Sequence, residues 1–403
     1  MADTAAEMVS QVRAAFEGRS HLRIRGGGTK DWYGEPPAAG DAILDTRQHA
    51  GIVDYDPSEL VLTARCGTPL RDLESELAAS SQMLACEPPH FGAQATVGGC
   101  VATGLSGPRR ATAGSVRDFV LGARLINGRG QHLAFGGQVI KNVAGYDVSR
   151  LLAGSLGILG VITEVSLKVV PVPVAEATLR FDGIGEQHAL ERLNRWAGQA
   201  LPASASAWSD GTLHLRLSGA DAAVRAASGA LGGERLDPVE ATALWRALRE
   251  QSLPFFAGEQ PLWRLSLPST APPLAMAAGE AAEADAAQDA AGDAGPLIEW
   301  GGALRWLRST APASTVREAA RAAGGHATLF RRGASASAGS GSGSGSGEGV
   351  RPGGAGGDAA SVPGGAPGCF APLDPALARI HQRLKAEFDP AGVFNRGRLY
   401  PGL

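Results

Sequence analysis

Four glycine-bearing segments in the first half of this sequence are its best candidates for chemistry. They are RGGGTK (25–30), ATVGGCVATG (95–104), SGPRRATAGSVRD (106–118) and AGSLGILGVIT (153–163). Glycine leaves main-chain N–H groups unobstructed, and a concave run of such groups can hold a diphosphate, with Lys30 or Arg25 as the countercharge. Together the segments predict one long anionic ligand. The alternative, which stays open, is that these glycines serve only tight turns and close packing.

The usual nucleotide and metal motifs are absent from the sequence. It contains no G-x-x-x-x-G-K-[ST] phosphate loop and no G-x-G-x-x-G that opens a helix after a strand. None of the eight histidines belongs to an H-x-H or H-E-x-x-H pair. No C-x-x-C pair is formed by Cys66, Cys86, Cys100 and Cys369. We therefore expect buried free thiols and no metal site.

The composition is typical of a globular protein. Apolar residues make up 44% of the 403 residues, charged residues make up 19%, and the net charge of -3 argues against a nucleic-acid partner. The first 20 residues lack the features of a signal peptide. The most apolar stretch, 151–163, is too short and too rich in glycine to be a transmembrane segment. We predict a cytoplasmic protein, and membrane association through partner proteins stays open.

Strands and short helices must position the glycine segments. The alternating residues 21–25 predict a strand that leads into RGGGTK. Residues 59–80 predict a strand, a turn and a helix capped by Thr68, with Pro69 at the first helical position.

A hairpin, a short helix and a strand should complete this first unit. Residues 116–137 predict a hairpin around the turn dipeptide Asn127-Gly128. Asp147 is placed to cap a short helix. The β-branched run 160–172 predicts the strand that closes the unit.

The composition changes after Pro173, where strand-like runs alternate with alanine-rich helices. This pattern predicts a second α+β domain, with domain boundaries at 1–173 and 174–403. Within the second domain, the Gly/Ser-rich residues 334–367 predict a flexible insert because they cannot form a core.

The chain should become ordered again in a helix that Asp374 caps and Pro375 begins. Its apolar stripe predicts a core-facing side. The stripe consists of Leu377, Ile380, Leu384 and Phe388.

The glycine segments and their order resemble the FAD-binding domain of the p-cresol methylhydroxylase/vanillyl-alcohol oxidase superfamily. A closer resemblance is to the E subunits of bacterial glycolate oxidases. It is carried by EPPHFGAQATVGGCVATGLSGPRR, GSVRDFVLGARLINGRG, GGQVIKNVAGYDVSRLLAGSLGILGVI and the ending FDPAGVFNRGRLYPGL. The resemblance implies an α+β fold: a two-subdomain FAD-binding domain of the p-cresol methylhydroxylase type, followed by a C-terminal α+β cap domain.

The resemblance also implies a set of cofactor-binding residues. Those expected around the diphosphate are Gly26, Gly27, Gly28, Thr29 and Lys30. Those expected along the ribityl and isoalloxazine groups are Thr96, Gly98, Gly99, Thr103 and Gly107. Val161 and Ile162 are expected to meet FAD through their backbone groups. For the two threonine hydroxyls, local hydrogen bonding is the alternative.

Thr29 stands where many members of the superfamily carry a histidine that bonds covalently to the flavin. A threonine cannot form that bond, so we expect noncovalent FAD. Three further departures or candidates stay open. Ile158 replaces a threonine of many relatives, Arg396 replaces a proline, and Asn395 is a candidate to approach the flavin.

No catalytic residue can be assigned from the sequence. The histidine-rich metal motif H-x-G-D-G-N-x-H of the D-2-hydroxy-acid dehydrogenases is missing, and His214 is expected to be a packed or surface histidine. Arg109 and Arg110 could attract a carboxylate or a phosphate, but an exposed pair is the favoured interpretation. Lys141 and Tyr146 could face the flavin, although Tyr146 could simply pack beside the short helix.

The resemblance implies an FAD-dependent oxidoreductase subunit of a hetero-oligomer that is inactive without its partners. Those partners would be an FAD-linked catalytic subunit, which oxidises glycolate to glyoxylate, and an iron–sulfur subunit, which receives the electrons. Two alternatives stay open: a standalone FAD oxidase of a sugar or alcohol, and a scaffolding subunit whose FAD is structural or absent.

Overall fold

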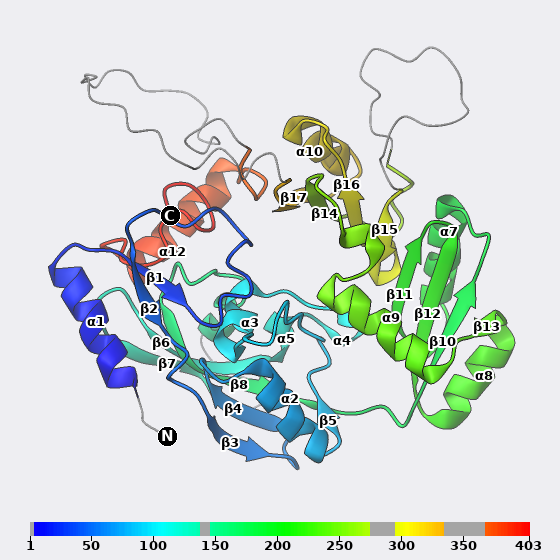
Figure 1. Ribbon diagram of the computed structural model, residues 1–403, viewed down its shortest axis with the longest axis horizontal. Helices are drawn as coiled ribbons and strands as arrows, with labels where there is room; N and C mark the ends of the chain where they lie inside the picture. Colours follow the sequence, from blue (N-terminus) through cyan, green and yellow to red (C-terminus); the bar gives the residue numbers. More distant parts are fainter. Residues whose placement is uncertain (1–3, 138–145, 275–294, 334–366) are drawn as a thin grey trace.

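A computed structural model describes residues 4–137, 146–274, 295–333 and 367–403. Two predictions fall outside these residues: the flexible insert, apart from its last residue, and the candidate Lys141. Figure 1 shows two main sheets with helices packed on them, and the α+β class is confirmed.

The first main sheet has five antiparallel strands in the order β3-β4-β8-β6-β7. Its strands are β3 (Ile52–Asp56), β4 (Val61–Arg65), β8 (Val161–Lys168), β6 (Val120–Ile126) and β7 (His132–Gly136). Strands β6 and β7 form the predicted hairpin, but the hairpin begins later than expected because Val116–Phe119 form helix α5. The predicted turn is in place, since the amide of Gly130 donates to the carbonyl of Asn127 at 2.9 Å.

Helices α2 (Leu70–Ala79) and α3 (Val97–Thr103) share the main hydrophobic core with this sheet. The predicted Thr68 cap of α2 is wrong. The Thr68 hydroxyl bonds instead to Gly51, accepting from its N–H at 2.9 Å, and no side chain caps the helix. Helix α2 begins at Leu70, one residue later than predicted, so Pro69 and not Thr68 occupies the N-cap position.

A small parallel pair, β1 (Leu22–Arg25) and β2 (Ala42–Asp45), lies beside the five-stranded sheet. Helix α1 (Ala5–Glu17) buries Met8 and Val12 in the core that it shares with these strands. Two further short strands, β5 (Gln82–Met83) and β9 (Val170–Pro171), pair with each other.

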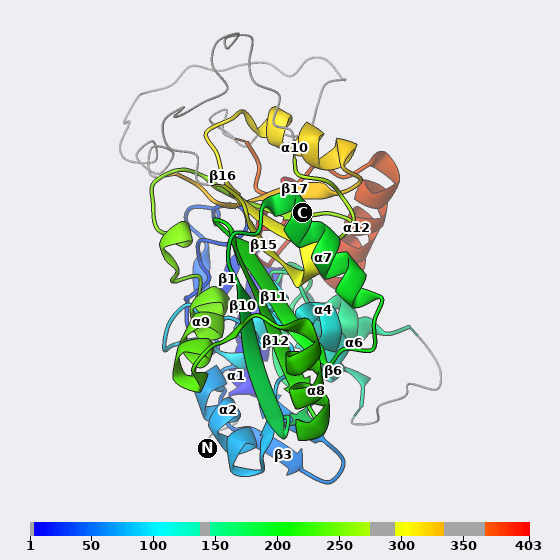
Figure 2. The ribbon, with the colours of Figure 1, turned by 90° about the vertical axis from the view of Figure 1, so that its right-hand side faces the viewer.

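The second main sheet has eight strands in the order β13-β10-β12-β11-β15-β16-β14-β17. They are β10 (Ala175–Phe181), β11 (Ala203–Ser209), β12 (Thr212–Gly219), β13 (Glu234–Arg235), β14 (Leu262–Ser266), β15 (Leu297–Glu299), β16 (Leu304–Arg308) and β17 (His326–Arg331). The helices around it are α7 (Glu186–Ala197), α8 (Asp221–Leu231), α9 (Pro238–Glu250) and α10 (Ala313–Ala322). Figure 2 shows this sheet edge-on, with α9 and α8 on opposite sides of it.

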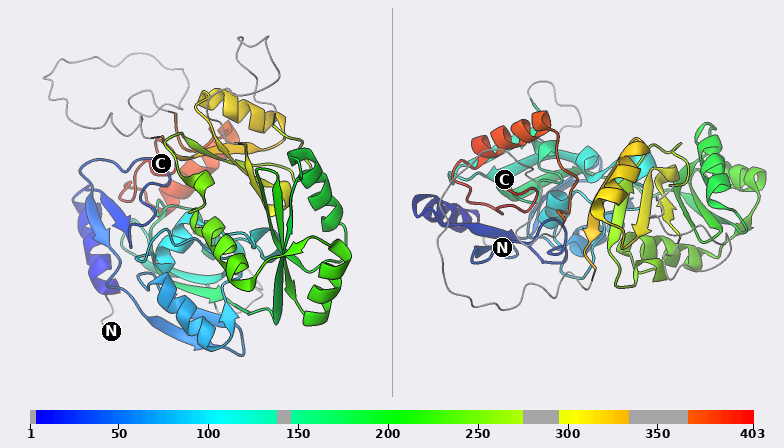
Figure 3. Two further views of the ribbon diagram at one scale, coloured as in Figure 1. Left: turned by 45° about the vertical axis from the view of Figure 1, so that its right-hand side comes forward. Right: turned by 90° about the horizontal axis from the view of Figure 1, so that it is seen from above.

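The two main sheets meet through an aromatic-rich cluster. Tyr33, Leu105 and Leu156 come from the first unit, and Trp306 and Phe330 come from the eight-stranded sheet. Figure 3 shows α9 in the region between the two units, and α4 (Arg110–Ala113) lies against β11. Three further short helices are α6 (Val148–Leu151), η1 (Pro254–Phe256) and η2 (Trp300–Gly302).

The last helix, α12 (Pro375–Phe388), begins as predicted, because Asp374 accepts hydrogen bonds from the first helical amides. Its predicted apolar stripe is wrong in the first half: Leu377 is 45% exposed and Ile380 is 52% exposed. The one buried residue of this helix is Lys385. The helix meets the core through only its last two turns, so its amino-terminal apolar residues face away from that core.

The carboxyl-terminal segment packs against the first unit. Leu384, Phe388 and Leu403 belong to or border the core of the five-stranded sheet, and Phe394 pairs with Leu22. The predicted boundaries at 1–173 and 174–403 do not account for this return of the chain.

Candidate functional site

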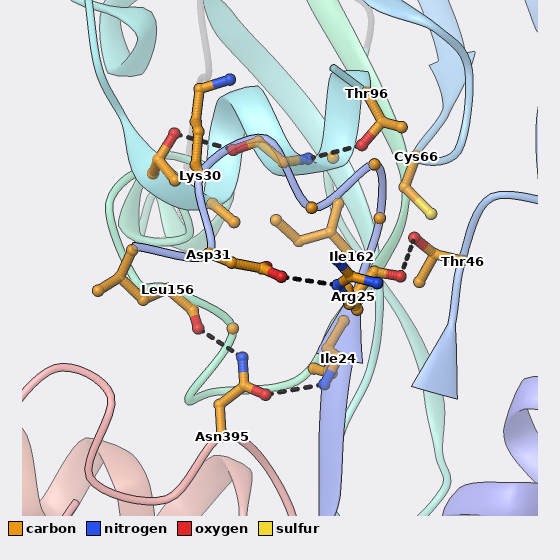
Figure 4. A pocket seen from close by; sticks show the side chains of 18 of the residues that line it. Ile24, Arg25, Lys30, Asp31, Thr46, Cys66, Thr96, Leu156, Ile162 and Asn395 are labelled. Carbon is orange, nitrogen blue, oxygen red and sulfur yellow. Dashed lines mark hydrogen bonds and ion pairs between the residues drawn. The ribbon is translucent and has the colours of Figure 1, made fainter. Parts of the chain in front are cut away.

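A cavity of about 110 Å³ lies where the glycine segments converge, and Figure 4 shows its lining. Its walls come from the loop after β1, from α3, from the loop before β8 and from the carboxyl-terminal segment. Of the twelve predicted cofactor-binding residues, ten line it: Gly26, Gly27, Gly28, Thr29, Lys30, Thr96, Gly98, Gly99, Thr103 and Ile162. The tertiary structure thus brings three of the four glycine segments together.

Consecutive main-chain N–H groups line one wall of the cavity. No turn, loop or side-chain hydrogen bond among the described residues uses the N–H of residues 26–30. Main-chain donors at a protein surface without internal partners bind water or a ligand. A run of such amides favours an anion with several oxygen atoms.

Two glycines of this wall are required by the backbone itself. A Cβ at Gly27 would lie 1.5 Å from the carbonyl oxygen of Gln94, and Gly28 has a φ of +71°. The loop therefore packs directly on the segment before α3, and only glycine permits that approach. The loop is closely packed, and its amides have no partner among the described residues. The two interpretations of its glycines, ligand binding and close packing, are therefore compatible.

The predicted threonines line the cavity, but their hydroxyls are bonded locally. Thr96 is the N-cap of α3 and accepts from the amide of Gly99 at 3.3 Å. The Thr103 hydroxyl donates to the carbonyl of Gly99 at 2.8 Å. The alternative of local hydrogen bonding therefore holds for both side chains, and a ligand would meet them only through contacts that leave these bonds in place.

Two of the predicted residues are not among those that line this cavity. Gly107 lies beside Glu87, where a Cβ would come within 2.3 Å of the Glu87 carbonyl oxygen, and its own carbonyl accepts from the Trp300 indole at 3.1 Å. Val161 is fully buried beside α1. Both residues pack against parts of the chain that are far away in the sequence, Trp300 for Gly107 and α1 for Val161. The local glycine motifs do not reveal such contacts.

Lys30 does not direct its charge into the cavity. Its ammonium group donates to the carbonyl of His90 at 3.2 Å and lies 5.7 Å from the centre of the Phe91 ring. Figure 4 shows the side chain leaving the loop on the side away from Arg25. Burial lowers the pKa of Lys30. The predicted role of this side chain as a phosphate countercharge therefore has no support in the geometry.

Arg25 lines the cavity, and its charge is shared with an aspartate. Asp31 lies 2.7 Å from Arg25 Nε and 2.9 Å from Arg23 Nη2. Two guanidinium groups facing one carboxylate leave a net positive charge beside the unpaired amides. Electrostatics and hydrogen-bond donors thus favour the same kind of ligand, an anion.

The carboxyl-terminal segment ties the walls of the cavity together. Asn395 Oδ1 accepts from the amide of Ile24 at 2.8 Å, and its Nδ2 donates to the carbonyl of Leu156 at 2.7 Å. The candidate Asn395 is thus at the site, but both ends of its amide are engaged by the backbone. Arg398, which sequence reasoning missed, donates to the backbone carbonyls of residues 31, 33 and 35.

Sequence reasoning also missed Thr46, Cys66 and Gly157 as lining residues. Burial raises the pKa of the Cys66 thiol to about 12, so it remains protonated and unreactive at neutral pH. All four cysteines are free and buried, as predicted. The only signal for Gly157 in the sequence was its membership of the AGSLGILGVIT segment.

The other candidates take different positions. Arg109 is 7% exposed, so the favoured exposed pair is wrong for this residue, and its guanidinium pairs with Glu87 and Glu176. Arg110 is exposed and stacks on Trp300.

The structure also places three other residues that the sequence singled out. Tyr146 is 97% exposed, so it does not pack beside α6. Ile158 is buried, and its carbonyl accepts from the Lys385 ammonium group at 2.8 Å. Arg396 pairs with Asp41 at 2.6 Å.

Within the described residues, no group of three or more His, Cys, Asp or Glu side chains is arranged to hold a metal ion. None of the described helices has both the length and the apolar character that crossing a bilayer requires.

Comparison with known proteins gives this site a context. Residues 1–136 match the family described as the FAD binding domain. The chain is 46% identical over 401 residues to the glycolate oxidase subunit GlcE of Escherichia coli (strain K12), and the alignment covers 100% of this chain and 99% of that protein.

Shorter similarities cover the first part of the chain. The glycolate oxidase subunit GlcD of Bacillus subtilis (strain 168) is 32% identical over 163 residues, which are 40% of this chain and 34% of that protein. A D-lactate dehydrogenase of Archaeoglobus fulgidus is 36% identical over 166 residues, which are 41% of this chain and 37% of that protein.

Solved structures of alkyldihydroxyacetonephosphate synthase share the fold. One aligns with a TM-score of 0.60 at 14% identity and covers 100% of this chain and 75% of that chain. Another aligns with a TM-score of 0.51 at 17% identity and covers 66% of this chain and 61% of that chain. The family match and this likeness confirm the predicted fold class and FAD as the cofactor.

Proposed function

This chain belongs to the family of the glycolate oxidase subunit GlcE, and from this premise we propose that it is the FAD-binding subunit of a glycolate oxidase complex. In that complex it takes part in the oxidation of glycolate to glyoxylate and relays electrons to an iron–sulfur subunit. Its other partner is an FAD-linked catalytic subunit, a role for which GlcD-like proteins are the candidates.

One observation carries the proposal. Residues 26–30, whose amides have no partner among the described residues, line a cavity in a chain that aligns over its whole length with a glycolate oxidase subunit. These amides would bind the diphosphate of FAD. A cavity of about 110 Å³ encloses one part of a dinucleotide, so the remainder would lie along the adjoining surface between the two sheets.

FAD supplies the two-electron acceptor for the oxidation of a 2-hydroxy acid. The chain itself would hold the cofactor through backbone groups at Gly26, Gly27 and Gly28, with Arg25 nearby as a positive charge. Thr29 lines the same loop and offers no ring nitrogen for a covalent link. The bound FAD is therefore noncovalent.

Among the described residues that line the cavity, we find no side chain suited to accept a proton from a hydroxyl group. Among the described lining residues, the Asp31 carboxylate is neutralised by arginines, and Cys66 keeps its proton. A proton acceptor is a requirement for oxidising a hydroxy acid. We therefore expect the isolated chain to be inactive with glycolate and to act only beside its catalytic partner.

The first test is the absorption spectrum of the purified full-length chain, with and without added FAD. We expect a flavin spectrum and the release of the flavin into the supernatant after acid precipitation. Flavin that stays with the precipitate would contradict noncovalent binding. A chain that remains colourless after incubation with FAD would overturn the proposed function.

The second test is glycolate addition to the FAD-loaded chain, first alone and then with both partner subunits. Bleaching of this subunit's flavin only in the assembled complex supports the relay. Turnover by the isolated chain with oxygen or a dye would identify a standalone oxidase. A flavin that stays oxidised throughout turnover would identify a scaffold.

A further inference from the structure

The eight-stranded sheet turns one face toward the FAD-binding unit. Side chains alternate along a strand, so Leu262, Arg264 and Ser266 of β14 share one face, while Trp263 and Leu265 pack on the other side against α10. Leu262 belongs to the cluster that contains Leu156 of the cavity wall. Arg264 therefore points toward the FAD-binding unit from a sheet face that is otherwise mostly apolar.

The Arg264 guanidinium has no hydrogen-bond acceptor and no ion pair among the described residues. Its central carbon lies 5.1 Å from the centre of the Trp300 ring, and Arg110 stacks on the same ring at 4.4 Å. Arg264 is partly buried. A partly buried guanidinium with five donors and no acceptor is available to an anionic ligand.

A buried carboxyl group lies close to Arg264. Glu299 ends β15 and is 4% exposed, and its Oε1 accepts from the Trp306 indole at 2.8 Å. Trp306 is the cross-strand partner of Arg264 in the pairing of β14 with β16. No salt bridge of the described residues involves Glu299, so its second carboxyl oxygen and the Arg264 guanidinium are both available to a third molecule.

Arg264 and Glu299 line one small cavity of about 20 Å³ together with Gly107, Trp306 and Phe330. This volume holds about one water molecule or one carboxylate oxygen. A ligand can therefore place only its charged end here, and its other atoms must lie outside this small volume. Gly107, which the sequence assigned to the flavin, forms part of this second cavity.

We propose that Arg264 and Glu299 form a binding site for a small monocarboxylate of the 2-hydroxy-acid class, on the face of the eight-stranded sheet that meets the FAD-binding unit. The choice of a 2-hydroxy acid rests on the proposed function, whereas the carboxylate site itself rests on the unpaired guanidinium and the shared cavity. Arg264 binds the carboxylate through its N–H groups, and the Glu299 carboxyl group faces the same end of the ligand from the other wall of this cavity.

The protonation of Glu299 should control this site. Burial raises the pKa of Glu299 to about 7, although the Trp306 hydrogen bond and the Arg264 charge act in the opposite direction. The charged groups that face it are Arg264 and, farther away, Glu87; Arg249 also borders the cavity. Below pH 7 the carboxyl group is neutral and does not repel an anion. Above pH 7 it is charged, and carboxylate binding weakens.

The test is calorimetric titration of the FAD-loaded chain, without partner subunits, with glycolate, acetate and ethylene glycol. Glycolate and acetate should bind at pH 6, and ethylene glycol, which has no carboxylate, should not. Glycolate binding should weaken about tenfold between pH 6 and pH 8, as expected for a single group with a pKa near 7.

Three variants test the residues. R264Q should weaken glycolate binding at least tenfold, and E299Q should bind equally at both pH values because its amide stays neutral. The matched control is R192Q, since Arg192 stacks on Phe181 and Trp196 outside this cavity and should leave binding unchanged. If R264Q does not fold, the pH profile of E299Q decides.

The outcomes separate this inference from the proposed function. FAD binding without any carboxylate binding overturns the site and leaves the proposed function intact. Glycolate binding that is unchanged in R264Q, or an E299Q variant that keeps the wild-type pH dependence, also overturns the site. Failure to bind FAD overturns the proposed function, and carboxylate titration of the FAD-free chain then tests the site by itself.

Discussion

Glu87 and Arg216 form a two-point ion pair between the FAD-binding unit and the eight-stranded sheet. Arg216 Nη1 lies 2.9 Å from Glu87 Oε1, and Arg216 Nη2 donates to Oε2 at 2.9 Å. Arg109 binds the same carboxylate from the other side and reaches Glu176 of β10. This buried network fixes the sheet face that carries Arg264 relative to the FAD-binding cavity.

We predict that Glu87→Gln lowers the free energy of unfolding by about 3–5 kcal/mol, because it leaves two buried guanidinium groups without their shared anion. Urea denaturation measures the change. The control is Asp72→Asn, which removes an exposed ion pair with Arg71 and should leave the urea midpoint nearly unchanged. A Glu87→Gln protein as stable as the wild type would show that the network does not join the units.

The same network predicts acid sensitivity. Burial acts to raise the pKa of Glu87, but the charges and hydrogen bonds of Arg216 and Arg109 outweigh it and hold the pKa below its ordinary value. The stabilisation is therefore present above pH 4.5 and is lost as the pH falls through the lower, folded-state pKa. In urea titrations from pH 7 to pH 4, Glu87→Gln should lose less stability than the wild type.

Gly27→Ala should abolish FAD binding. The added methyl group would lie 1.5 Å from the Gln94 carbonyl oxygen, so the loop must move away from its place in the cavity wall. Fluorescence titration with FAD measures the loss. The control is Gly185→Ala, because a Cβ there meets nothing within 4 Å and FAD affinity should not change. Normal FAD affinity in Gly27→Ala would mean that the cofactor does not depend on this loop.

Asn395→Ala should weaken FAD binding at least tenfold and lower the free energy of unfolding by about 1–3 kcal/mol. The substitution leaves the Ile24 amide and the Leu156 carbonyl without their partner. Asn395 also has a φ of +42°, which alanine adopts with strain. Asn395→Gly removes the same hydrogen bonds without that strain, so equal loss of FAD affinity in both variants would assign the effect to the hydrogen bonds.

His214 should make the protein less stable at mildly acidic pH. Burial and, second, the charge of Arg180 lower the pKa of its imidazole to about 4, against Asp182, which acts to raise it. The unfolded chain binds the proton with the ordinary histidine pKa of 6.5, so stability falls as the pH drops from 6.5 toward 4. The slope is at most about 1.4 kcal/mol per pH unit.

His214→Gln should remove this part of the pH dependence, and NMR titration of the His214 ring should give a midpoint near 4 in the folded protein. A midpoint near the ordinary histidine pKa of 6.5 would show that the imidazole is not shielded from water. Because the Glu299 carboxyl group is predicted to act with the opposite sign, the urea experiments need the E299Q background as a second reference.

Local patterns predicted the elements that frame the site. The strand before RGGGTK, the Asn127-Gly128 hairpin and the helix capped by Asp374 all formed, since neighbouring residues decide turns and caps. The glycine loop itself was recognisable because three successive glycines after a strand are rarely needed except for a sharp turn or a close approach.

Side-chain direction was harder to predict. Lys30 follows the glycines immediately, yet it turns toward His90, and Arg109 is buried by Glu87 and Glu176, which lie far away in the sequence. The apolar stripe of α12 suggested a core, but only the packing of its last turns decided that Lys385 and not Ile380 is buried.

The sequence by itself determined the class of protein, the cofactor and the loop that offers its amides, because these depend on residue types and short spacings. Only the tertiary structure decided which charges remain unpaired. Asn395 closes the cavity because it meets Ile24 and Leu156, which lie hundreds of positions earlier in the chain. Arg264 has no acceptor within the part of the chain that the structure describes. Such contacts depend on how the sheets pack together, and no local pattern encodes that arrangement.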